Sequence, residues 1–143
     1  MKFKRSKIIS NKLIHSDSRG DFLSIIDDKI NNISFLKSKK NTIRSNHYHL
    51  NDWHYIYVIS GSIHYLFKKI NEKKINYLHV KKGEVIFTPP MEIHTTYFSQ
   101  ETNMIVANGQ NRKKNTYEND LVRFELANLK NVKSVIKKIK IDG

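Results

Sequence analysis

Four histidines in the middle of the chain are the residues whose types and spacing are best suited to chemistry. His47 and His49 are separated by one residue, His54 follows five positions later, and His94 lies forty positions further on. Imidazole nitrogens bind divalent metals, and a histidine can instead act as a base because its ordinary pKa is roughly 6.5. Three or four nitrogens around a point with an open coordination position would form a catalytic metal site. We expect these four histidines to form one site.

The element that must position the first pair is a strand over residues 44–49. Side chains at positions i and i+2 of a strand point to the same face. His47 and His49 therefore project together, and Tyr48 points the other way.

The third and fourth histidines are expected on two further strands. In a strand over residues 53–59, His54 shares one face with Ile56 and Val58, and the other face carries an apolar aromatic stripe. If the aliphatic face lines a barrel, His54 lines it as well. His94 follows the turn at Pro89–Pro90, where a neighbouring strand begins. The remaining histidines, which we interpret as ordinary surface or barrel residues, are His15, His64 and His79.

Short β-type segments fill most of the chain and predict an all-β fold. They are rich in Ile, Val, Tyr and Phe and are separated by turn residues. Apolar residues at helical spacing near the end predict a short C-terminal helix at about 128–140. We therefore expect a single domain over residues 1–143. The predicted strands span residues 7–14, 21–26, 33–37, 44–49, 53–59, 62–68, 75–80, 84–88, 94–99 and 103–107.

Composition excludes several classes of protein. The 143 residues include no Cys, which removes disulfides, thiolate nucleophiles and Cys-type zinc sites. The basic start is not followed by a continuous apolar segment, and no apolar run approaches the roughly 20 residues of a membrane span. The net charge of +13 comes mainly from scattered Lys residues without a stripe of Arg and aromatic residues. We expect a cytoplasmic protein that binds neither nucleic acid nor membrane.

The histidine spacings resemble the two sequence motifs of the cupin superfamily. In the first, His47-x-His49 is followed after four residues by His54 and after six more by Gly61, with His54 where cupins usually have Glu. In the second, Gly83, Pro89 and His94 match, and Met91 replaces a Gly. The resemblance covers residues 44–98 and implies a cupin jelly-roll β-barrel.

Within the cupins, two segments look like the sugar-nucleotide group, which includes rhamnose-type 3,5-epimerases, 3,4-ketoisomerases and a zinc-carrying domain of capsule-synthesis reductases. The first segment, residues 17–22, contains Arg19, and the second is Arg44-Ser-Asn-His47. The resemblance implies that Arg44 binds substrate and that His47 is the base. His49 matches the second histidine of the ketoisomerases, which argues against a plain rhamnose epimerase.

The expected function is therefore that of an isomerase or epimerase acting on a nucleotide-linked keto sugar in surface-polysaccharide or glycan biosynthesis. The resemblance implies a tyrosine acid, for which Tyr117, Tyr57 and Tyr97 are candidates, with Tyr117 preferred. Arg44, Arg19, Tyr57 and His49 are the candidate substrate-binding residues. A divalent metal, Zn, Fe, Ni or Mn, could be held by His47, His49, His54 and His94, and no organic cofactor is expected.

Two other functions remain open from the sequence. One is an iron- or nickel-dependent oxygenase acting on a small organic substrate, which a nitrogen-rich site would also suit. The other is a sugar-binding barrel without catalysis. The aromatic stripe of Trp53, Tyr55 and Tyr57 predicts a homodimer, although cover by the N-terminal strands would explain it equally well.

Overall fold

Strands dominate the computed structural model, which describes residues 3–111 and 113–142. Their alternating aliphatic and aromatic residues suit a half-buried pleated surface. The strands are β1 (Lys7–Ile9), β2 (Lys12–Asp17), β3 (Gly20–Ser24), β4 (Asn32–Ser38), β5 (Thr42–His49), β6 (His54–Ser60), β7 (Ser62–Lys69), β8 (Asn76–Lys81), β9 (Val85–Thr88), β10 (Glu92–Phe98), β11 (Thr102–Asn108) and β12 (Leu121–Arg123). The helices are α1 (Lys114–Asp120) and α2 (Val132–Asp142).

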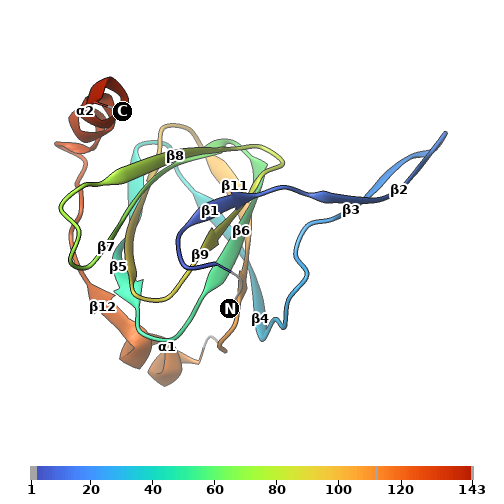
Figure 1. The fold of residues 1–143 in the computed structure, drawn as a ribbon, viewed down its shortest axis with the longest axis horizontal. Coiled ribbons are helices and arrows are strands. Elements are labelled where there is room, and N and C mark those ends of the chain that lie inside the picture. Colours follow the sequence, from blue (N-terminus) through green and yellow to red (C-terminus); the bar gives the residue numbers. More distant parts are fainter. Residues whose placement is uncertain (1–2, 112, 143) are drawn as a thin grey trace.

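Two antiparallel five-stranded sheets form the body of the molecule (Figure 1). One has the order β1-β9-β6-β11-β4 and the other β12-β5-β10-β7-β8. Their facing sides bury one apolar core, so the predicted all-β fold is confirmed. The buried core residues are Ile56, Val58, Ile63, Tyr65, Phe67, Val80, Ile86, Phe98, Met104 and Val106.

Two turns of the barrel contain residues of the cupin-like motifs, Gly61 and Met91. Gly61, between β6 and β7, has a φ of 85°, and a Cβ there would collide with Thr102. Met91, where the second motif usually has Gly, also has a positive φ of 62°. The chain therefore keeps the left-handed turn before His94 without the glycine.

The predicted C-terminal helix is present, but it begins at Val132 rather than near residue 128. Asn128 and Asn131 form a turn before the helix, in which Asn131 Oδ1 accepts the backbone N–H of Asn128 at 2.8 Å. The backbone carbonyl of Asn128 accepts the N–H of Val132 at 2.9 Å, which satisfies the first backbone donor of the helix. Val132 and Ile136 pack against the outer face of the β5–β10–β7 sheet. Neither helix in the described residues is long and apolar enough to cross a membrane.

One prediction of local structure was wrong, and two short elements were missed. Residues 7–14 do not form one strand: β1 pairs with β9, and β2 pairs with β3 in a separate hairpin. The chain breaks at Asn11, whose side chain donates to the carbonyl of Gly83 at 3.0 Å. Helix α1 and strand β12 were not predicted, because their short sequences lack a long hydrophobic period.

The β2–β3 hairpin, which we call the arm, extends away from the barrel (Figure 1). All residues of β2 are exposed. Four large apolar side chains of the arm are between 44% and 62% exposed, namely Leu13, Ile14, Phe22 and Leu23. Such a surface is typical of a segment that packs against another chain.

The aromatic stripe on β6 is covered within the chain. Tyr55 is 3% exposed and packs with Phe87, and its hydroxyl donates to Asp28 at 3.0 Å. Residues Phe3, Ile9, Ile25, Ile26 and Ile30 complete this cluster. The cover comes from the N-terminal part of the chain, as the second explanation proposed, but Ile9 of β1 is the one residue of these five that lies in a strand. The stripe does not itself support a dimer.

His64 and His79, interpreted above as ordinary barrel residues, form a stacked pair on the outer face of β7 and β8. Their ring centroids are 4.6 Å apart, and the planes are nearly parallel at 6°. The His64 ring nitrogens hydrogen-bond with the hydroxyls of Tyr77, at 2.7 Å, and Ser99, at 2.9 Å. Burial, with smaller effects of His79 and Lys140, lowers the pKa of His64 to about 4.

This pair predicts that the fold loses stability in mild acid. Between pH 6.5 and 4 the unfolded chain binds a proton at His64 that the folded chain does not, so stability falls as the pH falls. Because the ring is only half-buried, we expect a loss of roughly 1 to 2 kcal/mol. Urea unfolding at pH 7.5 and 5.0 should show a smaller difference for His64→Gln than for the wild type. Equal differences in the two proteins would contradict the assignment.

Candidate functional site

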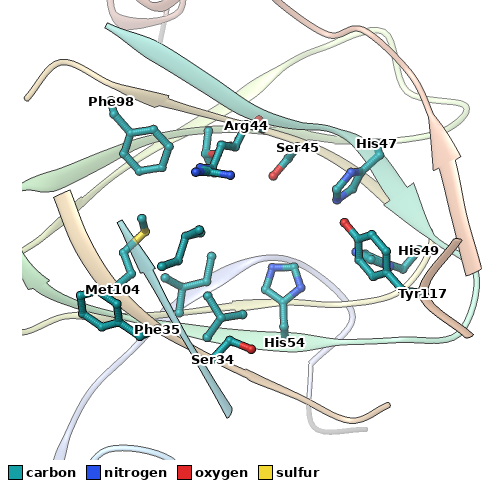
Figure 2. A pocket seen from close by; sticks show the side chains of 14 residues that line it. Ser34, Phe35, Arg44, Ser45, His47, His49, His54, Phe98, Met104 and Tyr117 are labelled. Atoms are coloured by element: carbon teal, nitrogen blue, oxygen red, sulfur yellow. The ribbon is translucent and has the colours of Figure 1, made fainter. Parts of the chain in front are cut away.

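A cavity of about 280 Å³ lies between the two sheets and is lined by three of the four predicted histidines (Figure 2). One end carries His47, His49, His54 and Tyr117, and the other end is apolar. The apolar lining residues are Phe35, Leu36, Ile56, Phe98, Met104 and Val106. The cavity can therefore hold a small organic group against a cluster of imidazoles.

Strand pairing brings three of the histidines to within the reach of a single ion. His47 and His49 lie on β5, and His94 of β10 is directly opposite His47 in the antiparallel register. The ring centroid of His47 is 4.8 Å from that of His49 and 4.7 Å from that of His94. One nitrogen of each ring lies within 4.8 Å of the other two. All three side chains are buried.

His54 comes from β6 in the opposite sheet and completes the cluster. Its ring centroid lies 5.8 Å from that of His49 and 5.4 Å from that of His94. His54 shares its face of β6 with Ile56 and Val58, as alternation predicted. The structure thus brings all four predicted histidines together, with His54 slightly outside the closer set of three.

His94 has the properties of a neutral nitrogen donor. Its Nδ1 lies 3.1 Å from the carbonyl oxygen of Glu92, to which it donates. Its Nε2 is buried and has no hydrogen-bond partner among the described residues. Burial above all, and also the charge of His49, lowers the pKa of His94 to about 3. An uncharged imidazole with a free lone pair is what a divalent metal requires, so the donor set fits a metal.

Asp120 is a buried site residue that the sequence did not reveal. It ends helix α1, and the next residue, Leu121, pairs with His49 across β12 and β5. The carboxylate Oδ2 lies 3.3 Å from Nδ1 of His49. A carboxylate at Nδ1 fixes the ring tautomer and leaves Nε2 for chemistry. No local pattern identifies this aspartate, because long-range strand pairing creates the contact.

Asp52 and Asp120 together hold the loop that follows β5. Asp120 accepts the backbone N–H groups of Asn51 at 2.8 Å and Asp52 at 3.0 Å. Asp52 accepts the N–H groups of Trp53 and Gln110, both at 2.9 Å. Both carboxylates lie near His49, but their oxygens serve mainly to cap backbone groups.

Arg44 reaches the cavity because β5 contains a bulge. Strict alternation would put Arg44 and His47, three positions apart, on opposite faces. Ser45 and Asn46 instead have positive φ angles of 73° and 55°, and the register with β10 shifts at this point. Arg44 therefore lines the cavity together with His47. Its Nε donates to Ser38 Oγ at 2.6 Å, and the residue remains exposed.

Tyr117 on α1 lines the cavity, as expected for a candidate acid. Its ring centroid is 6.1 Å from that of His49, and the two side chains lie together at the histidine end of the cavity in Figure 2. Tyr97, by contrast, packs under α2 on the outside of the barrel.

Two residues proposed to bind substrate lie elsewhere. Tyr57 is on the other face of β6, in the cluster with Tyr55. Arg19 lies on the arm, where its side chain is 87% exposed and pairs with Asp17 at 2.7 Å. Neither residue lines this cavity.

Solved structures show which proteins share this fold. The QdtA 3,4-ketoisomerase of Thermoanaerobacterium thermosaccharolyticum, a double mutant in complex with TDP, has a TM-score of 0.66 and 20% identity, covering 98% of this chain and 97% of that one. The Mycobacterium tuberculosis rmlC epimerase has a TM-score of 0.66 and 14% identity, covering 86% and 70% of the two chains. These similarities establish a cupin jelly-roll fold.

The capsular polysaccharide assembling protein CapF from Staphylococcus aureus is also similar. Its TM-score is 0.63 at 22% identity, covering 82% of this chain but 33% of CapF. No curated protein matches the chain by sequence. Residues 15–122 match the family described as polysaccharide biosynthesis C-terminal domain. This matched segment contains all four site histidines. The chain belongs to this polysaccharide biosynthesis C-terminal domain family.

Proposed function

We propose that the protein is an isomerase or epimerase that acts on a nucleotide-linked keto sugar by histidine-mediated proton transfer. The observation that carries the proposal is the meeting of His47, His49 and Arg44 in one cavity. The similarity to a 3,4-ketoisomerase along nearly the whole of both chains supports this choice.

In the proposed reaction, His47 removes the proton from the carbon beside the keto group. The electron pair of that C–H bond forms a C=C bond, and the carbonyl oxygen gains the negative charge of an enediolate. When the hydroxyl on the deprotonated carbon gives its proton to the former carbonyl oxygen, return of a proton to the former carbonyl carbon moves the carbonyl by one position. Return to the original carbon from the other face inverts its configuration. No oxidant or reductant is needed.

The residues around His47 have complementary proposed roles. Tyr117 lies in the same cavity and supplies the hydroxyl that protonates the sugar oxygen. Asp120 holds His49 by its Nδ1, so His49 presents Nε2 to the substrate as a hydrogen-bonding group. The apolar end of the cavity excludes water from the enediolate.

Arg44 is proposed to bind the diphosphate of the substrate. A guanidinium group can pair with two phosphate oxygens at once. Arg44 is exposed at the surface and also borders the cavity, so it can hold the phosphates outside while the sugar lies inside. The cavity of about 280 Å³ matches a sugar ring better than a whole nucleotide sugar.

We also propose that His49, His54 and His94 hold a divalent metal such as Zn, Fe, Ni or Mn, which leaves proton transfer to His47. In that form of the site, Nε2 of His49 binds the metal instead of the substrate. When bound, the metal would polarise the keto oxygen as a Lewis acid. We expect elemental analysis of untagged protein to find close to one metal per chain. His94→Gln should lose most of it, whereas His64→Gln, outside the site, should retain it. Metal-free wild-type protein would contradict this proposal and leave proton transfer to the histidines alone.

The proposed reaction is tested by proton exchange. The protein is incubated with TDP-4-keto-6-deoxyglucose, the ligand present in a solved QdtA mutant, in D₂O and followed by NMR. We expect deuterium at the carbon next to the carbonyl and formation of an isomeric keto sugar. TDP binding without exchange would instead favour a non-catalytic sugar-binding barrel. The absence of both would exclude TDP-linked 4-keto sugars as substrates.

We propose further that the protein works as a homodimer joined through the arm. Four exposed apolar side chains on the arm would be covered by a second copy. Light scattering should give twice the chain mass for the wild type and the chain mass for Leu13→Ser/Phe22→Ser. Leu129→Ser, at a residue 58% exposed elsewhere, is the control and should remain dimeric. A monomeric wild type would refute the proposal.

A further inference from the structure

Two consecutive residues with left-handed backbone conformation precede the first site histidine. Ser45 has a φ of 73° and Asn46 a φ of 55°. Residues other than glycine rarely adopt this conformation, and they persist in it only where the surrounding structure holds them. Asn tolerates it better than most residues do.

The pair of residues creates a one-residue bulge in β5. Thr95 of β10 is opposite Ser45, and the preceding residue, His94, is opposite His47, so Asn46 is the extra residue. If the same residues formed a regular strand without a bulge, Arg44 would point to the outer side of the sheet, where Ile43 now packs near α2.

Hydrogen bonds on the outer side of the sheet hold the bulge in place. The side-chain oxygen of Asn46 accepts from the Thr95 hydroxyl and from the backbone N–H of Leu126, the latter at 2.9 Å. Its side-chain nitrogen donates to the carbonyl of Ala127 at 2.8 Å. The backbone carbonyl of Asn46 also accepts the N–H of Phe124 at 2.9 Å. The bulge is thus tied both to β10 and to the segment after β12.

We infer that Asn46 is a positioning residue. Its left-handed backbone forms the bulge in β5 that keeps Arg44 on the cavity side of the sheet together with His47. The inference rests on the proposed function, because it gives Arg44 its diphosphate-binding role. It adds a residue that touches no substrate and acts through Arg44.

Valine and glycine at position 46 both remove the Asn side-chain amide, but only glycine keeps the left-handed backbone conformation accessible. The two variants therefore separate the effect of the backbone conformation from that of the side chain. Valine is β-branched and disfavours the left-handed region, whereas glycine adopts it freely. We expect Asn46→Val to weaken TDP binding about tenfold, as measured by calorimetry, and Asn46→Gly to stay within about threefold of the wild type. Adding Asn46→Val to Arg44→Gln should cause no further loss, because both changes remove the same contact.

Crystal structures of the two variants test the inference whether or not TDP binds. We expect the hydrogen bond from Arg44 to Ser38 to persist in Asn46→Gly and to be lost in Asn46→Val. If the valine variant does not fold, Asn46→Ala should shift Arg44 in the same direction.

Asn41→Val is the matched control for strain, because Asn41 also has a positive φ, of 59°, at the turn before the same strand. It should lose stability and keep TDP affinity. An intact Arg44–Ser38 bond in Asn46→Val, or its loss in Asn46→Gly, would overturn the inference. A wild type that does not bind TDP would count against the proposed function alone, since the structures still locate Arg44.

Discussion

Replacing His47 by Gln is expected to abolish most of the proton exchange between solvent and a keto-sugar nucleotide. Glutamine approximates the size of histidine but cannot accept a proton at neutral pH. Removal of a general base typically lowers the rate by about 10²- to 10⁴-fold. Deuterium incorporation into TDP-4-keto-6-deoxyglucose, followed by NMR, measures this loss directly. TDP affinity should change little, because Arg44 rather than His47 is proposed to hold the phosphates.

The same experiment distinguishes His47 from its neighbour. His64→Gln, on the outer face of β7, is the matched control and should exchange at the wild-type rate. His49→Gln should retain measurable exchange if His49 only hydrogen-bonds the substrate. Full exchange in His47→Gln together with complete loss in His49→Gln would transfer the role of base to His49, which Asp120 contacts.

The sequence was sufficient to predict the histidine cluster because β5 between His47 and His49 and β6 after His54 follow the regular alternation of a strand. Alternation placed His47 with His49, and His54 with Ile56, and these side chains do line one cavity. The proline-bounded turn also located the strand that carries His94. These predictions needed only the period of two residues and the positions of the turns.

The rest of the site depends on a strand bulge and on long-range strand pairing, neither of which can be predicted from the two-residue period of a strand. Regular alternation would place Arg44 on the face opposite to His47, and Arg44 reaches the cavity only because of the bulge at Ser45 and Asn46. Its placement in the site therefore came from the family resemblance and not from strand geometry. Asp120 meets His49 through the pairing of β12 with β5, seventy-one positions apart in sequence. The arm was also missed, because its strand pattern resembles that of a barrel strand.

Asp120→Asn is expected to lower the turnover number about 10- to 100-fold, the effect typical of losing a group that orients a functional histidine. Asparagine keeps the side-chain oxygen that accepts the N–H of Asn51 but loses the oxygen that accepts the N–H of Asp52, so the loop is held by fewer hydrogen bonds. Its amide, however, can donate to Nδ1 of His49, which would favour the other ring tautomer and turn an N–H toward the substrate. Steady-state kinetics should show a fall in kcat with KM nearly unchanged.

Asp52→Asn provides the matched control for this prediction. Asp52 is buried beside Asp120 and caps the same loop through Trp53 and Gln110. The control variant should lose stability, seen as a lower Tm, yet retain kcat. If Asp52→Asn and Asp120→Asn lower kcat equally, the carboxylates act through loop stability alone. A selective loss in Asp120→Asn would instead show that the orientation of His49 limits the reaction.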